Sequence, residues 1–408
     1  MTPLPVKLAP AWFRPRSFLI GLAAGLALLS GLGWRAAHVD YHPGFTRFCP
    51  SISPEGNYYP TIGEMCSIVR QRCRPGQVLV IVGGNSIFFG VGQPAAEMWT
   101  RRLQDLLGDR YCVLNFAFRG ASASDGGALV AEVLRREYPR QIYVANVAPV
   151  EGIYGLGSDP YRFLFWEAYF KGLLASYPPR SADVRLELAR NPAYHHDVPG
   201  LVGSVWLDRL LHFHDLWNYV TMQWANTVPY PTHPDLPELA WPRIRFVDDE
   251  PDFRAIPFEA RFPNSSLPLE MPIVRGYSAL NYRRTAAGGW EMLPASRAQM
   301  QRFLGSAMPV PLRGRTLIVV SQSSPFYMDQ LSPDERRRDT AACEDSIANW
   351  RAAGYQAITY SDDFRAEDFG DRAHLTVDGG DKLARTVAGE VRRIASARGY
   401  FPPAKGAP

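Results

Sequence analysis

The 408-residue chain lacks any block of five or six consecutive like charges, although it carries 44 basic and 40 acidic residues. Protein arms that bind nucleic acid are built from such blocks. With its charge scattered and a net value of only +4, we expect no nucleic-acid partner. A hydrophobic share of 46% also excludes a disordered or fibrous chain and indicates a globular protein with a large core.

Cysteine is scarce, with five residues in the whole chain. Cys49, Cys66 and Cys73 lie close together before the first expected strand, where a disulfide could hold that segment down in an exported domain. Cys112 and Cys343 fall in an expected strand and an expected helix. The odd count leaves at least one thiol unpaired within the chain, and five buried thiols are the alternative.

An uncharged run covers 17–34 near the amino terminus. At about 1.5 Å per residue, a helix of this length is just long enough to cross a bilayer. Lys7, Arg14 and Arg16 precede it, and positive charge on that side keeps the amino terminus in the cytoplasm. We therefore expect a cytoplasmic stretch at 1–16, an anchor at 17–34 and the remaining chain outside. A cleaved signal peptide is the alternative, although no good small-x-small cleavage site and no lipidation cysteine follow the run.

Strand and helix patterns alternate after a neck at 35–77 that is rich in proline, glycine and tyrosine. Continuous β-branched runs predict strands buried on both faces, and apolar residues at helical spacing predict the helices between them. The expected elements are strands at 78–83, 111–116, 141–147, 316–320 and 355–360, and helices at 95–107, 126–136, 333–353 and 379–397. This order predicts an α/β protein, a flavodoxin-like three-layer sandwich with a five-stranded parallel sheet and right-handed crossovers.

The alternation is interrupted between the third and fourth strands by residues 151–312. This segment holds many prolines and six of the ten tryptophans, and it is too long for a loop and too apolar for a linker. We expect an inserted cap over the ligand edge of the sheet, and an unrelated second domain is the alternative. The core is then divided into 78–150 and 313–400, with a tail at 401–408.

The first strand ends in two glycines, and Asn85 and Ser86 follow at once. Open α/β sheets bind their ligands at the carboxyl ends of the strands, so Ser86 is the candidate nucleophile. A serine needs a base and a group that orients the base. His374 is the one histidine inside the alternating core, and Asp371 precedes it in D-R-A-H. Because both loops leave the carboxyl edge, we expect Ser86 and His374 to meet.

Two pairs of histidines elsewhere in the chain could suggest a metal site, His195 with His196 and His212 with His214. Adjacent side chains point apart, and an i, i+2 pair diverges on a helix. We therefore expect no metal, and no other cofactor.

Four short blocks, taken in order, resemble the SGNH, or GDSL-type, hydrolase and acyltransferase superfamily, in particular its membrane-anchored extracytoplasmic members. The blocks are G-G-N-S at 83–86, N-F-A-F-R-G-A-S with Gly120, V-A-N-V with Asn146, and D-x-x-H with Asp371 and His374. The chain departs from the family pattern at Asn85, where the family has aspartate, and at Ala145 and Val147, where the third block has glycine and aspartate in the family.

The resemblance implies a catalytic triad of Ser86, His374 and Asp371. It also implies an oxyanion hole formed by the backbone N–H groups of Ser86 and Gly120 and the side-chain amide of Asn146.

The activity that the resemblance implies is that of a serine esterase or O-acyltransferase. We expect it to act on O-acyl groups, acetyl first, of an extracytoplasmic cell-envelope polysaccharide. The catalytic domain would face the periplasm or the extracellular side of the inner membrane, and a multi-spanning membrane O-acyltransferase would be a partner that supplies the acyl group. The alternatives are a catalytically silent glycan-binding or scaffold subunit of a membrane acylation complex, and a lipid or small-ester hydrolase.

Overall fold

The computed structural model describes residues 15–39, 60–150 and 250–401, together with short stretches at 46–47, 51–52, 56–57, 164, 168, 173, 211–213, 215–216, 219–220 and 246–247. Structural statements below concern these residues. Most of the expected cytoplasmic stretch, almost all of the expected tail, and His195, His196 and His214 lie outside them.

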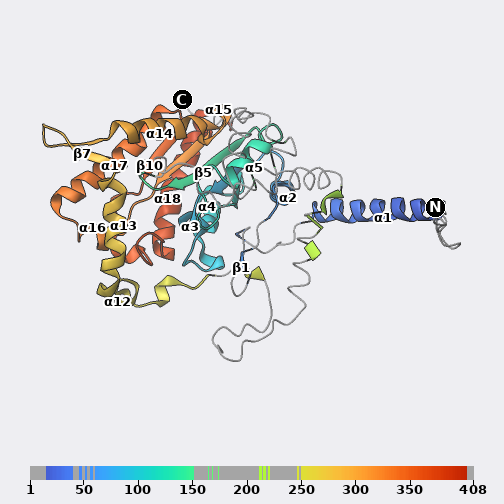
Figure 1. The fold of residues 1–408 in the computed structure, drawn as a ribbon, viewed down its shortest axis with the longest axis horizontal. Helices are drawn as coiled ribbons and strands as arrows, with labels where there is room; N and C mark the ends of the chain where they lie inside the picture. The colour runs from blue at the N-terminus through green and yellow to red at the C-terminus, as the bar shows by residue number, and fades with distance from the viewer. Residues whose placement is uncertain are drawn as a thin grey trace, which may run out of the picture.

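A five-stranded, all-parallel sheet lies at the centre of the molecule (Figure 1). Its strands are β3 (Val78–Gly83), β4 (Tyr111–Asn115), β5 (Gln141–Val147), β9 (Thr316–Val320) and β10 (Gln356–Thr359). They lie side by side in the order β10-β9-β5-β3-β4. All residues of β3, β5 and β9 are buried, as is usual for strands covered on both faces. The prediction of an α/β protein with a five-stranded parallel sheet is confirmed.

Helices connect the strands and cover both faces of the sheet. They are α4 (Trp99–Leu107), α5 (Gly127–Val133), α17 (Pro333–Ala352) and α18 (Val377–Ala397). The helix expected at 95–107 is divided, because Met98 is extended and separates the 3₁₀ turn η1 (Ala95–Glu97) from α4. α4 packs on β4, α5 packs on β3 and β5, and α17 packs on β9 and β10. α4 packs along α18, which returns over the sheet from its last strand.

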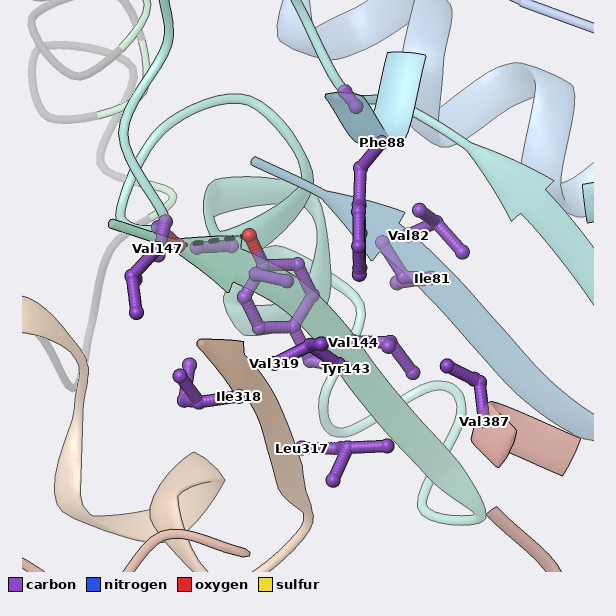
Figure 2. Packing of buried hydrophobic residues seen from close by; sticks show 14 of the residues in the cluster. Ile81, Val82, Phe88, Tyr143, Val144, Val147, Leu317, Ile318, Val319 and Val387 are labelled. Atoms are coloured by element: carbon purple, nitrogen blue, oxygen red, sulfur yellow. Dashed lines mark hydrogen bonds between the residues drawn. The ribbon is translucent and has the colours of Figure 1, made fainter. Parts of the chain in front are cut away.

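The core is a close-packed cluster of aliphatic and aromatic side chains from the central strands. Figure 2 shows Ile81 and Val144 from neighbouring strands together with Val387 of α18. Tyr143 lies among them, and its buried hydroxyl donates a hydrogen bond to the carbonyl of Ala123 at 2.7 Å. This bond removes the cost of burying a polar atom in an apolar cluster.

The described part of the expected insertion, from residue 250 onward, forms small helices and a hairpin. These are η3 (Phe253–Ala255), α12 (Phe258–Arg261), η4 (Asn264–Ser266), α13 (Leu267–Ala279), β7 (Tyr282–Arg284), β8 (Trp290–Met292), α14 (Pro294–Ala307) and α15 (Val310–Arg313). α13 and β8 pack on α17. Phe253 fills the space beside Gly92 and Gly370, where a β-carbon would overlap its ring. The segment therefore contacts loops at the carboxyl edge of the sheet.

The neck is attached to the rest of the protein in three ways. It packs on a helix of the core, it pairs with a strand of the insertion, and a disulfide joins it to the sheet. Its helix α2 (Ile62–Arg72) begins with a capping box formed by Thr61 and Glu64, and it packs on α5. The short strands β1 (Ser51–Ile52) and β2 (Gly56–Asn57) form a small sheet with β6 (Phe246–Val247), so neck and insertion are paired.

Cys73, at the end of α2, is bonded to Cys112 of β4, and a disulfide thus holds the neck to the sheet. The alternative of five buried thiols is wrong. Cys66 and Cys343 are both buried, and Cys49 lies outside the described residues.

The amino-terminal helix α1 (Pro15–Ala36) has 22 residues and extends away from the rest of the molecule (Figure 1). Its large apolar side chains are exposed, Ile20 by 70% and Leu28 by 64%. The helix is long and apolar enough to cross a membrane, and a signal sequence would have the same length and composition.

Candidate active site

Ser86 lies directly beyond the carboxyl end of β3, as the first residue of the short helix α3 (Ser86–Phe89). Asn85 caps this helix, and its Oδ1 accepts a hydrogen bond from the N–H of Ile87 at 3.0 Å. The chain turns at Gly84, whose φ of +99° favours glycine. A β-carbon at Gly84 would also overlap the side-chain oxygen of Asn146. Gly84 is therefore required both by the backbone conformation at this position and by the lack of space for a side chain.

His374 and Asp371 lie on a tight loop between the 3₁₀ turn η5 (Ala366–Asp368) and α18. The loop closes on itself, because the N–H of Gly370 donates to the carbonyl of His374 at 2.8 Å. The Oδ1 atom of Asp371 accepts the N–H groups of Ala373 and His374, both at 2.8 Å. These bonds hold the carboxylate and the imidazole in a fixed relative position.

Three side chains form a continuous hydrogen-bonded series at this edge of the sheet. Asp371 Oδ2 lies 2.6 Å from His374 Nδ1, and His374 Nε2 lies 2.8 Å from Ser86 Oγ. The serine and the histidine are 288 positions apart in the sequence. The structure therefore brings together the expected nucleophile, base and orienting group.

The charge of Asp371 determines which imidazole nitrogen carries the proton. Burial by itself would raise the pKa of this carboxyl. The hydrogen bond and the charge of His374, with the two backbone N–H groups, outweigh burial and hold the pKa below its ordinary value. An ionised carboxylate can only accept, so Nδ1 of His374 carries a hydrogen, and in the neutral imidazole Nε2 then presents its lone pair to the Ser86 hydroxyl.

The hydrogen-bonded series opens into a cavity of about 250 Å³. Ser86, Gly120 and His374 lie on its wall, and Gly120 has a φ of +74°. The wall also includes Asn85, Ser321, Gln322, Ser323, Asp339 and Arg372.

Asn146 is fully buried and is not on the wall of this cavity. Its Oδ1 accepts the N–H of Asn85 at 3.1 Å, and its Nδ2 donates to Asn85 Oδ1 at 2.7 Å and to Ser321 Oγ at 3.1 Å. Both amide hydrogens of Asn146 are thus used inside the protein. Of the five expected site residues, Ser86, Gly120 and His374 face the cavity, Asp371 supports His374, and Asn146 holds Asn85.

Gln93 connects the loop that carries Ser86 to the loop that carries His374, although the sequence analysis did not identify it. The side chain is fully buried, and its Nε2 donates to the carbonyls of Leu375 and Thr376 at 3.2 and 3.3 Å. Its Oε1 accepts the N–H of Trp99 at 2.9 Å. The loop that follows Ser86 is therefore bonded to the chain immediately after His374.

Arg47 of the neck is a second residue that sequence reasoning missed. It is almost fully buried, and its guanidinium donates to the carbonyls of Phe89 and Gly90 at 2.9 and 2.8 Å and also to that of Gln93. No motif surrounds it, and only the fold reveals that the neck holds the loop after the nucleophile.

Within the part of the chain that the structure describes, no three histidine, cysteine or acidic side chains come together in a way that could hold a metal ion. His212 contacts Asp215 at 3.3 Å, and this carboxylate also accepts the hydroxyl of Thr61 at 2.6 Å.

Comparisons with protein-family models, curated proteins and solved structures find no match to this chain. What the site can do chemically therefore follows from its own geometry. A hydroxyl with an aligned base, beside a cavity lined by backbone and amide groups, is suited to attack on an acyl carbon.

Proposed function

We propose that the protein is a serine esterase or O-acyltransferase of the SGNH type, with Ser86 as nucleophile, His374 as general base and Asp371 as the orienting group. The observation that carries this proposal is the unbroken series of hydrogen bonds from Asp371 through His374 to Ser86, which ends at a cavity. The lowered pKa of Asp371 keeps its carboxyl ionised, as the orienting role requires.

The reaction proceeds in two acyl-transfer steps. Ser86 Oγ attacks the ester carbonyl carbon while His374 Nε2 takes the hydroxyl proton. The bond from the acyl carbon to the leaving alkoxide breaks, and His374 returns the proton to that oxygen. Water in an esterase, or an acceptor hydroxyl in a transferase, then attacks the acyl carbon of the acyl-serine while His374 takes its proton. The bond from the acyl carbon to Ser86 Oγ breaks, and His374 returns the proton to Ser86.

The backbone N–H groups of Ser86 and Gly120 are the first donors for the oxyanion. Ser86 is the first residue of α3, so its N–H has no acceptor within that helix. Asn85 supplies the third donor in place of Asn146. It lies on the cavity wall, its Oδ1 is held by Ile87 and Asn146, and its Nδ2 has no hydrogen-bond partner among the described residues.

The strand order supports the flavodoxin-like classification. Numbered along the chain, the parallel strands run 2-1-3-4-5 across the sheet. In doubly wound sheets with this order, ligands bind where the order reverses, between the first and third strands. Ser86 follows the first of these strands and Asn146 lies near the end of the other.

Location and substrate class follow from the helix, the disulfide and the resemblance. α1 would anchor the chain in the inner membrane, with the catalytic domain on the periplasmic or extracellular side. The Cys73–Cys112 disulfide is typical of an oxidising compartment. In an esterase, an acylated cell-envelope polysaccharide is then the substrate. In a transferase, the polysaccharide is the acceptor, and a multi-spanning membrane O-acyltransferase is the partner that supplies the acyl group.

The test uses the full chain in detergent, with fluorophosphonate labelling and release of p-nitrophenol from p-nitrophenyl acetate as readouts. We expect wild type to be labelled and active, Ser86→Ala to lose both signals, and Ser396→Ala, at an exposed serine on α18, to keep both. Labelling that persists in Ser86→Ala would refute the assignment of the nucleophile. Absence of labelling in folded wild type would indicate a silent binding module instead.

A further inference from the structure

A second cavity, of about 390 Å³, adjoins the catalytic cavity. The two cavities share Gln322, Ser323 and Asp339 in their walls. A third cavity, of about 550 Å³, shares Arg336, Thr340 and Glu344 with the second and reaches Trp290 of the β7–β8 hairpin. The three cavities therefore adjoin one another around α17, beginning beside Ser86 and His374.

One face of α17 lines this series of cavities. Arg336, Asp339, Thr340, Cys343, Glu344 and Ile347 all contribute to the second cavity. Their spacing of three or four residues puts them on the same side of the helix. A groove that follows a helix for three turns suits an extended, repetitive ligand better than a small compact one.

The second cavity is lined by apolar side chains, among them Met328, Ile347 and Phe364, together with hydroxyl and carboxylate groups and a single basic residue. Thr340, Thr359 and Ser361 present hydroxyls, and Asp362 and Glu344 present carboxylates. Its one basic residue, Arg336, is paired with Asp329 at 3.5 Å. An anionic polymer would be repelled by such a wall, whereas hydroxyl groups would find acceptors on it.

Asp339 lies at the junction of the catalytic and second cavities. Its side chain is half-buried, and its carboxylate has no hydrogen-bond partner among the described residues. Burial raises the pKa of this carboxyl to about 6, although the charge of Arg338 opposes the rise. A carboxylate with unused lone pairs beside an acyl-transfer site is suited to accept a hydrogen bond from a sugar hydroxyl.

We propose that the cavities along α17 form a binding groove for a neutral, hydroxyl-rich glycan chain, with Asp339 binding a hydroxyl of the sugar unit nearest Ser86. This inference rests on the proposed acyl-transfer function and adds to it the position and the charge class of the polymer. Binding energy from the distant sugar units would hold the reacting unit in place beside Ser86.

The test measures binding without requiring turnover, so it stays readable even if the esterase proposal fails. The full chain in detergent is titrated by calorimetry at pH 7.5 with cellohexaose, maltohexaose and hexa-N-acetylchitohexaose. Hexagalacturonate is the anionic counterpart, and the matching disaccharides test the length of the groove. We expect at least one neutral hexasaccharide to bind, about 10-fold or more tighter than its disaccharide and than hexagalacturonate.

The variants locate the binding. Asp339→Leu should weaken binding of that hexasaccharide by about 10-fold or more, and Asp105→Leu, at an exposed position on α4 away from all three cavities, should leave it within twofold. Glu344→Leu, at an exposed site between the second and third cavities, should weaken binding of the hexasaccharide more than that of the disaccharide. Circular dichroism checks that each variant is folded.

Several outcomes would overturn the inference. These are the failure of all three neutral hexasaccharides to bind folded wild type, binding of hexagalacturonate as tight as theirs, and wild-type binding by both Asp339→Leu and Glu344→Leu. Fluorophosphonate labelling of the same preparation reports on the esterase proposal separately, because it depends on Ser86 and not on the groove.

Discussion

Two hydrogen-bonded groups meet at the end of β3, and they differ in charge and in exposure. The catalytic series of Asp371, His374 and Ser86 contains ionisable groups, and the side chains of Asp371 and His374 are 44% and 23% exposed. The amide group formed by Asn85, Asn146 and Ser321 is neutral. Asn146 is fully buried, and both hydrogens of its amide are bonded.

The difference indicates a division of roles. Residues that move protons must change charge, and partial contact with water keeps the energetic cost of that change low. Residues that fix geometry are best neutral, buried and fully hydrogen-bonded, since any loss then leaves an unpaired polar atom in the interior. Changes in the catalytic series should therefore reduce activity more than stability, and changes in the amide group should reduce stability as well.

The largest effect on activity should come from Asp371→Asn. The amide cannot enforce the Nδ1–H tautomer of His374, so kcat/KM for p-nitrophenyl acetate should fall by about 10⁴-fold. At neutral pH the melting temperature should fall only slightly, because partial exposure of the carboxyl keeps its contribution to stability small. A fall of less than tenfold would show that Asp371 does not orient the base.

The pH dependence of stability should also reveal Asp371. Its pKa is lower in the folded protein than in the unfolded chain, so its contribution is complete above the ordinary carboxyl range and is lost as the pH falls through the folded value. Chemical denaturation between pH 6 and pH 3 should therefore show a smaller acid-induced loss of stability in Asp371→Asn than in wild type.

Asn85→Asp separates the two roles that the amide group could have. Aspartate keeps the acceptor atoms for Ile87 and Asn146 but lacks the Nδ2 donor. If Asn85 donates to the oxyanion, kcat should fall by about 100-fold to 1,000-fold. Activity within threefold of wild type would instead limit Asn85 to a structural role.

Gly84→Ala, next to the amide group, should be the most destabilising of these changes. Alanine at a φ of +99° is strained, and its β-carbon would overlap the Asn146 oxygen and lie 3.0 Å from the Asn146 backbone nitrogen. We expect the free energy of unfolding to fall by about 3 kcal/mol. In the double-mutant cycle with Asn146→Ala, part of this loss should be recovered, because the overlapping oxygen is gone. Strict additivity would argue against the contact.

Asn146→Ala alone should cost about 2 kcal/mol of unfolding free energy, since it removes the hydrogen bonds of the buried Asn146 amide to the part-buried Asn85 and the buried Ser321. Urea denaturation measures this loss. A fall in kcat with no change in stability would instead place Asn146 among the oxyanion donors.

The smallest effect, and the one of opposite sign, should come from Asp339→Asn. The pKa of this carboxyl is raised to about 6, so ionisation above that pH destabilises the native state. The neutral amide should stabilise the protein by about 1–2 kcal/mol at pH 7.5, and this gain should disappear below about pH 4. Asp105→Asn, at an exposed position, is the matched control and should show no such pH dependence.

Much of the fold could be predicted because it depends on local pattern. The limits of β3, β5 and β9 agree with the expected strands, since continuous β-branched runs have few other stable conformations in a large protein. The helix at 95–107 was less predictable, because the extended residue Met98 divides a pattern that reads as continuous. The expectation that residues 151–312 form a cap over the sheet concerned mostly residues that the structure does not describe.

The sequence by itself determined the parallel sheet, the apolar amino-terminal helix and the positions of Ser86, Asp371 and His374 at strand and loop ends. These features follow from side-chain periodicity and from the rule that parallel strands end at one edge. Only the tertiary structure decided that Asn146 holds Asn85 instead of facing the cavity, that Cys73 pairs with Cys112, and that a cavity lined by α17 adjoins the cavity beside Ser86. Each depends on distances between segments far apart in the chain, which are set by packing and not by local sequence.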